Sequence, residues 1–274
     1  AADTGFLPKP EFTVPIAQPQ IATVIANADP EGQGRVQVRF DWQMNDTTHF
    51  VRVMTPDAGG TDQITQNRGY VAIPEVGDQV MVNFVHSHPD RPFVMGGMFH
   101  GQTALGGGVN NHMRSIQTKS GIKVLMNDDE KSVTIIDPSG NTYFMDGKGN
   151  ISVTAPNDIT FTAGKNMNIN VGENMTSTVG SNQSTIVGQN QSNSVGMNQT
   201  ESVGMMKNLS VGSNFMTNVV GKMIEFITGN KESHTEKDRV RTSNGKITSQ
   251  SVGTHEHHSE KDVHNNSAEK SKNH

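Results

Sequence analysis

The chain has 274 residues, of which only 32% are apolar and 28 are glycine, so it is poor in the large side chains that build a conventional core. It contains no cysteine, which excludes a disulfide framework and any cysteine-based metal or redox site. The formal net charge of −5 at pH 7 argues against a nucleic-acid partner, because that function needs a basic surface.

Residues 1–20 are predicted to form an extended lead-in, because Pro8, Pro10, Pro15 and Pro19 punctuate them. The first residues lack the basic and apolar segments of a signal peptide, so none is expected in this sequence. No run of 18 apolar residues occurs, and no membrane-spanning helix is predicted.

Residues 21–100 have the pattern of a small closed β-barrel. Apolar or alternating segments between turn residues predict strands over 21–25, 35–40, 50–53, 79–85 and 93–97. Nine of the 14 aromatic residues of the chain fall within the first 100 residues, so a conventional core could form there. Among them, Phe40, Trp42 and Phe50 are predicted to be core residues rather than a platform on which nucleic-acid bases stack.

The sequence offers few candidates for chemistry. His86 and His88 have a spacing found in metal sites, but they run into Pro89 and Pro92, so a turn is predicted there. No nucleophile elbow, zinc-protease motif or phosphate-binding loop is present. The chain is therefore predicted not to be an enzyme, and no catalytic residue, cofactor or metal ligand is assigned.

Residues 101–120 contain Gly106, Gly107 and Gly108 and are predicted to be a linker. Residues 121–163 follow as a β-rich neck of hairpin-like units. Its strands are expected over 122–126, 132–136, 141–145 and 150–154. No segment longer than eight residues shows helical periodicity, so the chain is predicted to be all-β.

Residues 164–253 are built from a repeat of eight residues. Glycine recurs at every eighth position from Gly164 to Gly212, and a valine precedes all but the first of these glycines. So strict a period is typical of a β-solenoid or β-prism rather than of a disordered polar tract.

Each octad has room for an extended segment of about six residues and a two-residue corner, where glycine would allow a positive φ. With glycine as position 1, large apolar side chains concentrate at positions 4, 6 and 8, which share one face of a strand. They are Met167, Ile169, Val171, Met175, Leu209, Phe215 and the valines before the glycines. One chain would bury too little of this face to offset the entropy of ordering it, so three chains are predicted to pool their faces around one axis.

The eight-residue spacing of the glycines is interrupted once, because Gly221 follows Gly212 by nine residues. The later glycines are one residue out of step with the earlier series: Gly221, Gly229, Gly245 and Gly253. Lys237 stands at the missing place, and an extra residue near Val219 and Val220, accommodated as a β-bulge, is the interpretation. Few charges occur over 164–229, so the wall of the rod is expected to be neutral and polar.

Residues 254–274 form a polar tail with five histidines: His255, His257, His258, His264 and His274. In three copies, His255 and His257 could surround an axis with six imidazole nitrogens and hold a metal there. Counting octads from the last glycine, however, places His255 and His257 outward and Glu256 and His258 inward. A solvated or frayed tail is therefore the preferred interpretation.

The same count places Glu232 and Glu236 on the inward face. Burying unpaired carboxylates there would be costly. The regular winding is therefore expected to fail or loosen after about residue 230.

Two groups of motifs occur in an order that is found in one family. The first is the series of Val-Gly-x-Asn octads, which follows Thr118-Lys119-Ser120-Gly121 and Asp137-Pro138-Ser139-Gly140-Asn141. The second comprises Val36-x-Val38-x-Phe40, Arg52-Val53-x-x-Pro56-x-Ala58-Gly59, Pro74-x-Val76-Gly77-Asp78-x-Val80 and Asp90-Arg91-Pro92. Together they resemble the valine–glycine repeat (VgrG) spike proteins of type VI secretion, relatives of the cell-puncturing device of contractile phage tails.

The resemblance implies a homotrimer in which a small barrel of the oligonucleotide/oligosaccharide-binding (OB) type precedes an intertwined β-helix, or β-prism. It implies a structural spike of a contractile injection apparatus that punctures a target membrane transiently and delivers or carries effectors. The implied partners are the tail-tube protein, upstream hub domains, a tip-capping protein and effectors. Such a spike is assembled in the cytoplasm and secreted by the apparatus. The hub domains are not matched, so a C-terminal part of a longer protein is expected.

Two other functions fit an elongated, β-rich trimer. A fibre or adhesin stalk would need a membrane anchor or a receptor-binding head. A glycan-degrading β-helical tail spike would need longer coils with aromatic residues and acidic clusters. The sequence displays none of these features.

Overall fold

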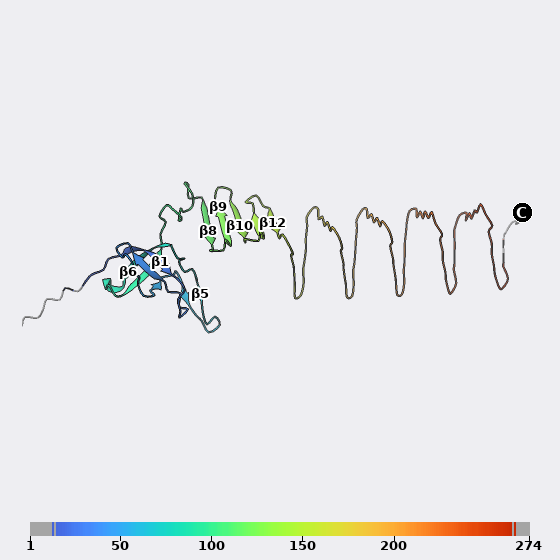
Figure 1. Ribbon diagram of the computed structural model, residues 1–274. Coiled ribbons are helices and arrows are strands. Elements are labelled where there is room, and N and C mark those ends of the chain that lie inside the picture. Colours follow the sequence, from blue (N-terminus) through green and yellow to red (C-terminus); the bar gives the residue numbers. More distant parts are fainter. Residues whose placement is uncertain (1–12, 14, 265, 267–274) are drawn as a thin grey trace, which may run out of the picture. The chain divides into compact units, whose positions relative to one another are not determined.

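The structure, a computed structural model, describes residues 13, 15–264 and 266, and its regular elements are strands apart from one short 3-10 turn (Figure 1). Most of the expected lead-in and part of the polar tail, including His274, lie outside the described residues. Within the described part, no helix is long and apolar enough to cross a membrane. The strands are β1 (Gln20–Ala26), β2 (Gln37–Phe40), β3 (Arg52–Val53), β4 (Ala58–Gly59), β5 (Arg68–Gly69), β6 (Gln79–Phe84), β7 (Pro92–Gly97), β8 (Met113–Gln117), β9 (Lys123–Asn127), β10 (Ser132–Ile136), β11 (Thr142–Met145) and β12 (Ile151–Thr154).

The first sheet has the strand order β2-β1-β6-β7-β3 and closes into a barrel. β1 pairs antiparallel with β2 and β6, β6 pairs antiparallel with β7, and β7 runs parallel to β3. Reciprocal backbone hydrogen bonds of 3.0 and 2.8 Å then join Val36, just before β2, to Val51, just before β3. This bridge connects the two edges of the sheet, so the small closed barrel predicted for this region is present.

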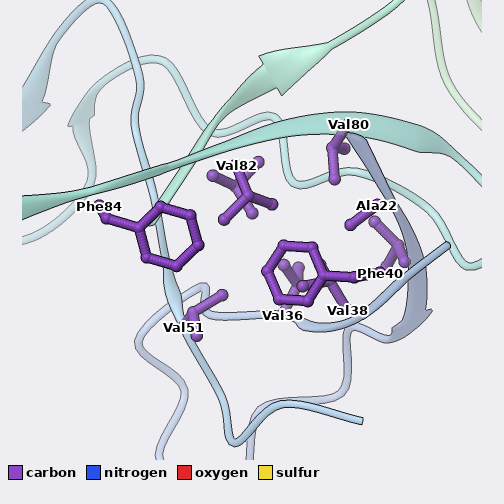
Figure 2. Close-up of a cluster of buried hydrophobic side chains, with 10 residues drawn as sticks. Ala22, Val36, Val38, Phe40, Val51, Val80, Val82 and Phe84 are labelled. Atoms are coloured by element: carbon purple, nitrogen blue, oxygen red, sulfur yellow. The ribbon is translucent and has the colours of Figure 1, made fainter. Parts of the chain in front are cut away.

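Side chains that alternate along the strands fill the barrel. Every second residue of β6 is buried, namely Val80, Val82 and Phe84. The rings of Phe84 and Phe40 face one another across the interior with 6.1 Å between their centroids (Figure 2). Valine supplies most of the remaining core: Ala22, Val24, Val36, Val38, Val51 and Val94. β-Branched side chains suit a pleated surface, which explains why so small a core forms strands.

Trp42 is not a core residue, contrary to the prediction from the sequence. Phe40 is buried and Phe50 is half-buried, whereas Trp42 is 68% exposed. It follows β2 in a turn, stacks on the Phe40 ring at 5.6 Å between centroids, and donates a 2.7 Å hydrogen bond from Nε1 to Oε1 of Gln20. The turn therefore directs the indole over the outside of the barrel.

Two short features decorate the barrel. β4 and β5 form a hairpin that the sequence analysis did not predict, supported by an ion pair of 2.6 Å between Arg68 and Asp57. The 3-10 turn η1 (Val85–Ser87) contains His86, whose φ is 55°, and the backbone N–H of His88 donates to the carbonyl of Val85. The turn predicted at these histidines is confirmed.

The second sheet is an antiparallel meander with the order β12-β11-β10-β9-β8 (Figure 1). Four of its strands lie where the sequence analysis placed them. β8 lies within 101–120, so the assignment of that whole segment to a linker is wrong. Apolar and polar residues do not alternate along this mostly exposed strand. Its pairing with β9, from Met113↔Asn127 to Gln117↔Lys123, depends on a neighbour rather than on a local pattern.

Asp137 and Asp146 organise the turns of this sheet in the same way. The Asp137 carboxylate accepts hydrogen bonds from the backbone N–H groups of Ser139 and Asn141, from the Ser139 hydroxyl at 2.6 Å and from the Asn141 amide at 2.8 Å. These donors lower the pKa of Asp137 from 3.8 to about 2, with the Ser139 hydroxyl as the largest cause. The pKa of Asp146 is lowered too, chiefly by the Asn150 amide. Such Asx turns fix the connections between strands.

The remaining chain has no paired strand. Between residues 155 and 264, all of which the structure describes, no strand is assigned and no backbone-to-backbone hydrogen bond is made. Every residue from 156 to 264 is exposed. The contacts divide the chain into two units between Thr176 and Ser177, and residues 177–264 by themselves wind through successive bends without a neighbouring strand (Figure 1).

Candidate functional site

The backbone bends of this segment keep an unbroken spacing of eight residues. They occur at 164–165, 172–173, 180–181, 188–189, 196–197, 204–205 and 212–213, and continue at 220–221, 228–229, 236–237, 244–245, 252–253 and 260–261. We number each octad from the first residue of its bend. Positions 1 and 2 are then the bend, and positions 3 to 8 are the extended part.

The bulge inferred near Val219 and Val220 is therefore wrong. The interval between the bends at 212–213 and 220–221 is the same as every other interval. What changes is the place of glycine within the bend, since Gly212 holds position 1 whereas Gly221 holds position 2. The sequence marks the glycine and not the bend, and so it suggested an extra residue that does not exist.

The proposed reason for the octad glycines is also wrong. In the described residues, positive-φ glycines occur from Gly32 to Gly149 and none in the octads. A Cβ added to any octad glycine would meet nothing within 4 Å in a single chain. The corner thus accepts other residues, which explains why Lys237 can occupy it.

Exposure separates the two faces of the octad even in the isolated chain. The aliphatic residues at position 8, from Val171 to Ile227, are all between 44 and 48% exposed. From Gly164 onward, large apolar residues at positions 4 and 6 are 60 to 71% exposed, and those at the other positions are 74 to 106% exposed. Positions 4, 6 and 8 therefore form one face, which we call the inner face, and the predicted pattern is confirmed.

Two ion pairs lie on the inner face. Lys207 pairs with Glu201 and Lys231 pairs with Glu225, each across one bend. In both pairs the glutamate holds position 6 and the lysine holds position 4 of the next octad. Sequence analysis missed these pairs because partners six residues apart on an extended chain share a face only when the bend between them is placed correctly.

The unbroken spacing reverses the faces assigned to the later charges. Glu232 and Glu236 hold positions 5 and 1, outside the inner face, so the reason for expecting the winding to fail after about residue 230 disappears. His255 and His257 hold positions 4 and 6, on the inner face, with ring centroids 4.6 Å apart. Glu256 and His258 are on the opposite face.

The position of His255 and His257 on the inner face does not by itself create a metal site. Nε2 of His258 and Oε2 of Glu256 lie 3.1 Å apart on the outer face. No group of three or more potential metal-binding side chains occurs in the part of the chain that the structure describes. The absence of an assigned metal ligand stays a prediction.

The outer face is less polar than expected. Over residues 197–226 it carries several nearly fully exposed apolar side chains, namely Met197, Met205, Met206, Met216, Ile224 and Phe226. Over residues 164–196 its residues are mainly Asn, Ser, Thr and Gln, as predicted, with Ile186 as an apolar exception. The prediction of a polar wall is therefore correct for most of residues 164–196 and wrong for residues 197–226.

Sequence reasoning did not identify a hollow in the surface of the barrel. It has a volume of about 760 Å³ and collects Arg35, Arg52 and Arg91 from separate segments. Arg35 is bound by Asp29 at 2.7 Å, and its guanidinium holds the pKa of that carboxyl well below its usual range. Asp90 also lines the hollow. These carboxylates offset part of the positive charge, and the geometry assigns no ligand.

Two known families match separate parts of the described chain, the barrel and the segment that runs from β11 into the octads. Residues 20–99 match the family described as the type VI secretion system/phage-baseplate injector OB domain. Residues 143–242 match the bacteriophage T4 gp5 C-terminal trimerisation domain. Spike protein VgrG1c of Pseudomonas aeruginosa is 31% identical over 117 residues, which cover 38% of this chain and 15% of that protein. The chain belongs to the VgrG-type spike family.

Other relatives bear the same family name. VgrG1b of Pseudomonas aeruginosa is 26% identical to this VgrG-type chain over 176 residues, which cover 57% of the chain and 22% of that protein. The actin cross-linking toxin VgrG1 of Vibrio cholerae is 32% identical over 105 residues, which cover 34% of the chain and 8% of the toxin. This chain thus spans less than a quarter of the length of these relatives.

The family match relates the inner face of the VgrG-type chain to trimerisation. The match to the trimerisation domain begins at Tyr143 in β11 and ends at Thr242, so it includes both ion pairs and all of the position-8 valines. It supports a homotrimer. The resemblance stated from the sequence is confirmed, and so are the OB-type barrel and the all-β class.

Proposed function

We propose that three copies of this chain wind their necks and octads around one axis as a β-prism, and that the resulting needle punctures a membrane. The observation that carries the proposal is the half-exposed inner face, on which valine recurs at position 8 with nothing to cover it. Burying the remaining exposure of one such side chain would contribute roughly 1 kcal/mol. The repeat multiplies this contribution along the whole segment.

The unpaired backbone supports the same arrangement. Residues 155–264 are extended between bends and make no backbone-to-backbone hydrogen bond within the described chain. Backbone donors and acceptors are obligatory hydrogen-bonding groups in folded proteins. Three intertwined chains would place a strand of another copy above and below each octad and satisfy these groups without leaving a long edge.

The neck supplies a second apolar surface for the axis. One row of side chains crosses all five strands through cross-strand pairs: Ile116, Val124, Ile135, Tyr143 and Val153. Of these, Ile116 is 67%, Ile135 45% and Val153 54% exposed. An exposed apolar row of this kind is typical of an interface, and three necks could bury it against one another.

Glycine acquires a role in the trimer that it lacks in one chain. Its bend needs no positive φ and has open space around it in the described chain. A corner without Cβ lets a neighbouring backbone approach closely. We therefore place the contact between neighbouring chains at the corners, where Gly164 to Gly253 recur.

The function follows from the family and from the shape that this assembly would have. A VgrG-type needle at the end of a contractile apparatus would be driven through a target membrane and would deliver or carry effectors. Its partners would be the tail-tube protein, upstream hub domains, a tip-capping protein and effectors, and the apparatus would secrete it. The chain itself would act mechanically and not as an enzyme.

Light scattering on the purified 274-residue chain tests the assembly. The expected mass is that of three chains, and the expected band on unboiled gel electrophoresis is a trimer that separates on boiling. A well-folded monomer in dilute solution would overturn the proposal. Incubation with cell-wall and capsular glycans should release no sugars, whereas released sugars would favour a glycan-degrading tail spike.

A further inference from the structure

The charges on the inner face do not balance. Counted by the bends from Gly164 to His264, the inner positions hold the acids Glu201 and Glu225, the cations Lys207, Lys231, Arg239 and Arg241, and the histidines His255 and His257. The two lysines are already paired with the two glutamates. Arg239 and Arg241 remain, at positions 4 and 6 of one octad, and have no ion-pair partner among the described residues.

The neighbouring octads do not supply the missing acid. Before this octad, the inner positions are Lys231, Ser233 and Thr235, and after it they are Ile247, Ser249 and Ser251. Aspartate and glutamate in this region are at outer or corner positions, as in Glu232, Glu236 and Asp238. In the trimer proposed above, on which this inference rests, threefold symmetry would bring six guanidinium groups together around the axis.

Six such groups need a compensating charge. An ion buried without a partner costs several kcal/mol, and guanidinium cannot escape this cost by losing its proton because its pKa is above about 12. A bound anion would offset part of this charge and accept hydrogen bonds from the guanidinium groups. The planar fork of donors on arginine fits the oxygens of phosphate-like groups with two parallel hydrogen bonds.

We propose that Arg239 and Arg241 of three chains form an axial site for a free tetrahedral oxyanion, phosphate or sulfate. The hydroxyls of Ser233 and Ser249 hold position 6 in the octads on either side and can donate further hydrogen bonds. The site exists only in the assembled needle. The anion is therefore part of the interior of the needle rather than a ligand that exchanges at its surface.

Anion release from the intact protein tests this site. The full chain is purified in chloride buffers free of phosphate and sulfate, its mass is checked by light scattering, and it is dialysed extensively and then unfolded. Ion chromatography, which distinguishes phosphate from sulfate, should find about one oxyanion for every three chains, because one symmetric layer of arginines forms one site. R239Q/R241Q should release none. The control K222Q/K246Q, which removes two shaft lysines at outer position 3, should release as much as the unchanged chain.

A second measurement keeps the test decisive where R239Q/R241Q does not assemble. The unchanged chain, refolded in chloride, should gain thermal stability when phosphate replaces chloride at constant ionic strength, because a ligand bound only by the folded state raises its melting temperature. A trimer that releases no oxyanion and gains no stability overturns the site and leaves the needle intact. Equal loss of anion from K222Q/K246Q would show surface binding and also overturn it. A monomer overturns both proposals.

Discussion

Lys231 reaches back across the bend at 228–229 to pair with Glu225, and the pairing of Lys207 with Glu201 repeats this relationship three octads earlier. Both pairs join position 6 of one octad to position 4 of the next. These two lysines and two glutamates of the inner face are thus compensated within each chain. In the proposed assembly they would be enclosed as pairs, which lessens the cost of their desolvation.

Removing one partner of such a pair should be costly if the inner face is enclosed. Glu225→Gln leaves Lys231 without its carboxylate and is expected to destabilise the trimer by about 3–5 kcal/mol, the range for a broken buried pair. The double variant E225Q/K231Q should recover most of this loss. Denaturant unfolding of the three proteins gives the values.

Glu232→Gln is the matched control, because Glu232 is at outer position 5 of the next octad. Its effect should stay below about 1 kcal/mol, as for exposed charges. If E225Q proves no more costly than E232Q, the pair is solvated and the inner face is not an interior.

Two adjacent residues test the face assignment. Val187 is at position 8 and is 46% exposed, whereas Ile186 is at position 7 and is 92% exposed. Val187→Asp should place three carboxylates in the interior and strongly reduce the trimer fraction. Ile186→Asp should leave the trimer unchanged. Light scattering at equal concentrations measures both, and equal behaviour of the two variants would contradict the assignment.

Deleting Val220 distinguishes an unbroken octad spacing from a bulge. If an extra residue were present, its removal would restore the glycine phase and stabilise the shaft. With the spacing unbroken, the deletion moves every later side chain to the opposite face and should destabilise residues 221–264. Limited proteolysis of the trimer should then cut this segment faster than in the unchanged chain, whereas slower cutting would support the bulge.

The pKa of Asp137 predicts a dependence on pH in the neck. Because its pKa is lowered from 3.8 to about 2 in the folded state, its stabilising effect is complete above about pH 4 and is lost as the pH falls through 2. Asp137→Asn should remove this part of the acid dependence of unfolding. NMR titration should show that Ser139→Ala raises the pKa of Asp137, because the Ser139 hydroxyl is its largest cause. Asp146 in the same spectrum is the control, since Asn150 and Lys148 determine its shift.

The barrel strands and the period of eight could be predicted because both are local patterns. Alternation in Val80, Val82 and Phe84 records one buried face, and the glycine series records one bend per octad. β8 could not be predicted in this way, because its residues do not alternate between apolar and polar and form a strand only beside β9. Trp42 was wrongly assigned to the core, because its hydrophobicity does not reveal that the turn after β2 directs its side chain out of the barrel.

The faces after residue 220 could not be derived from glycine spacing. The corner accepts residues as different as Gly212, Val220 and Glu236 at position 1, so its geometry comes from the repeating backbone and not from one residue type. A one-residue error in the corner exchanges the two faces of a strand. It therefore misplaced His255, His257 and the glutamates, although the repeat itself was identified correctly.

Because the interval between bends is constant, the length of any insertion or deletion in residues 164–264 determines which face every later side chain occupies. An insertion or deletion of eight residues would change the length of the proposed needle by one layer and leave every other side chain on its original face. Any other small change inverts or scrambles everything that follows it. In the proposed assembly, the length of the needle would therefore change in whole octads, each adding about 5 Å of strand spacing.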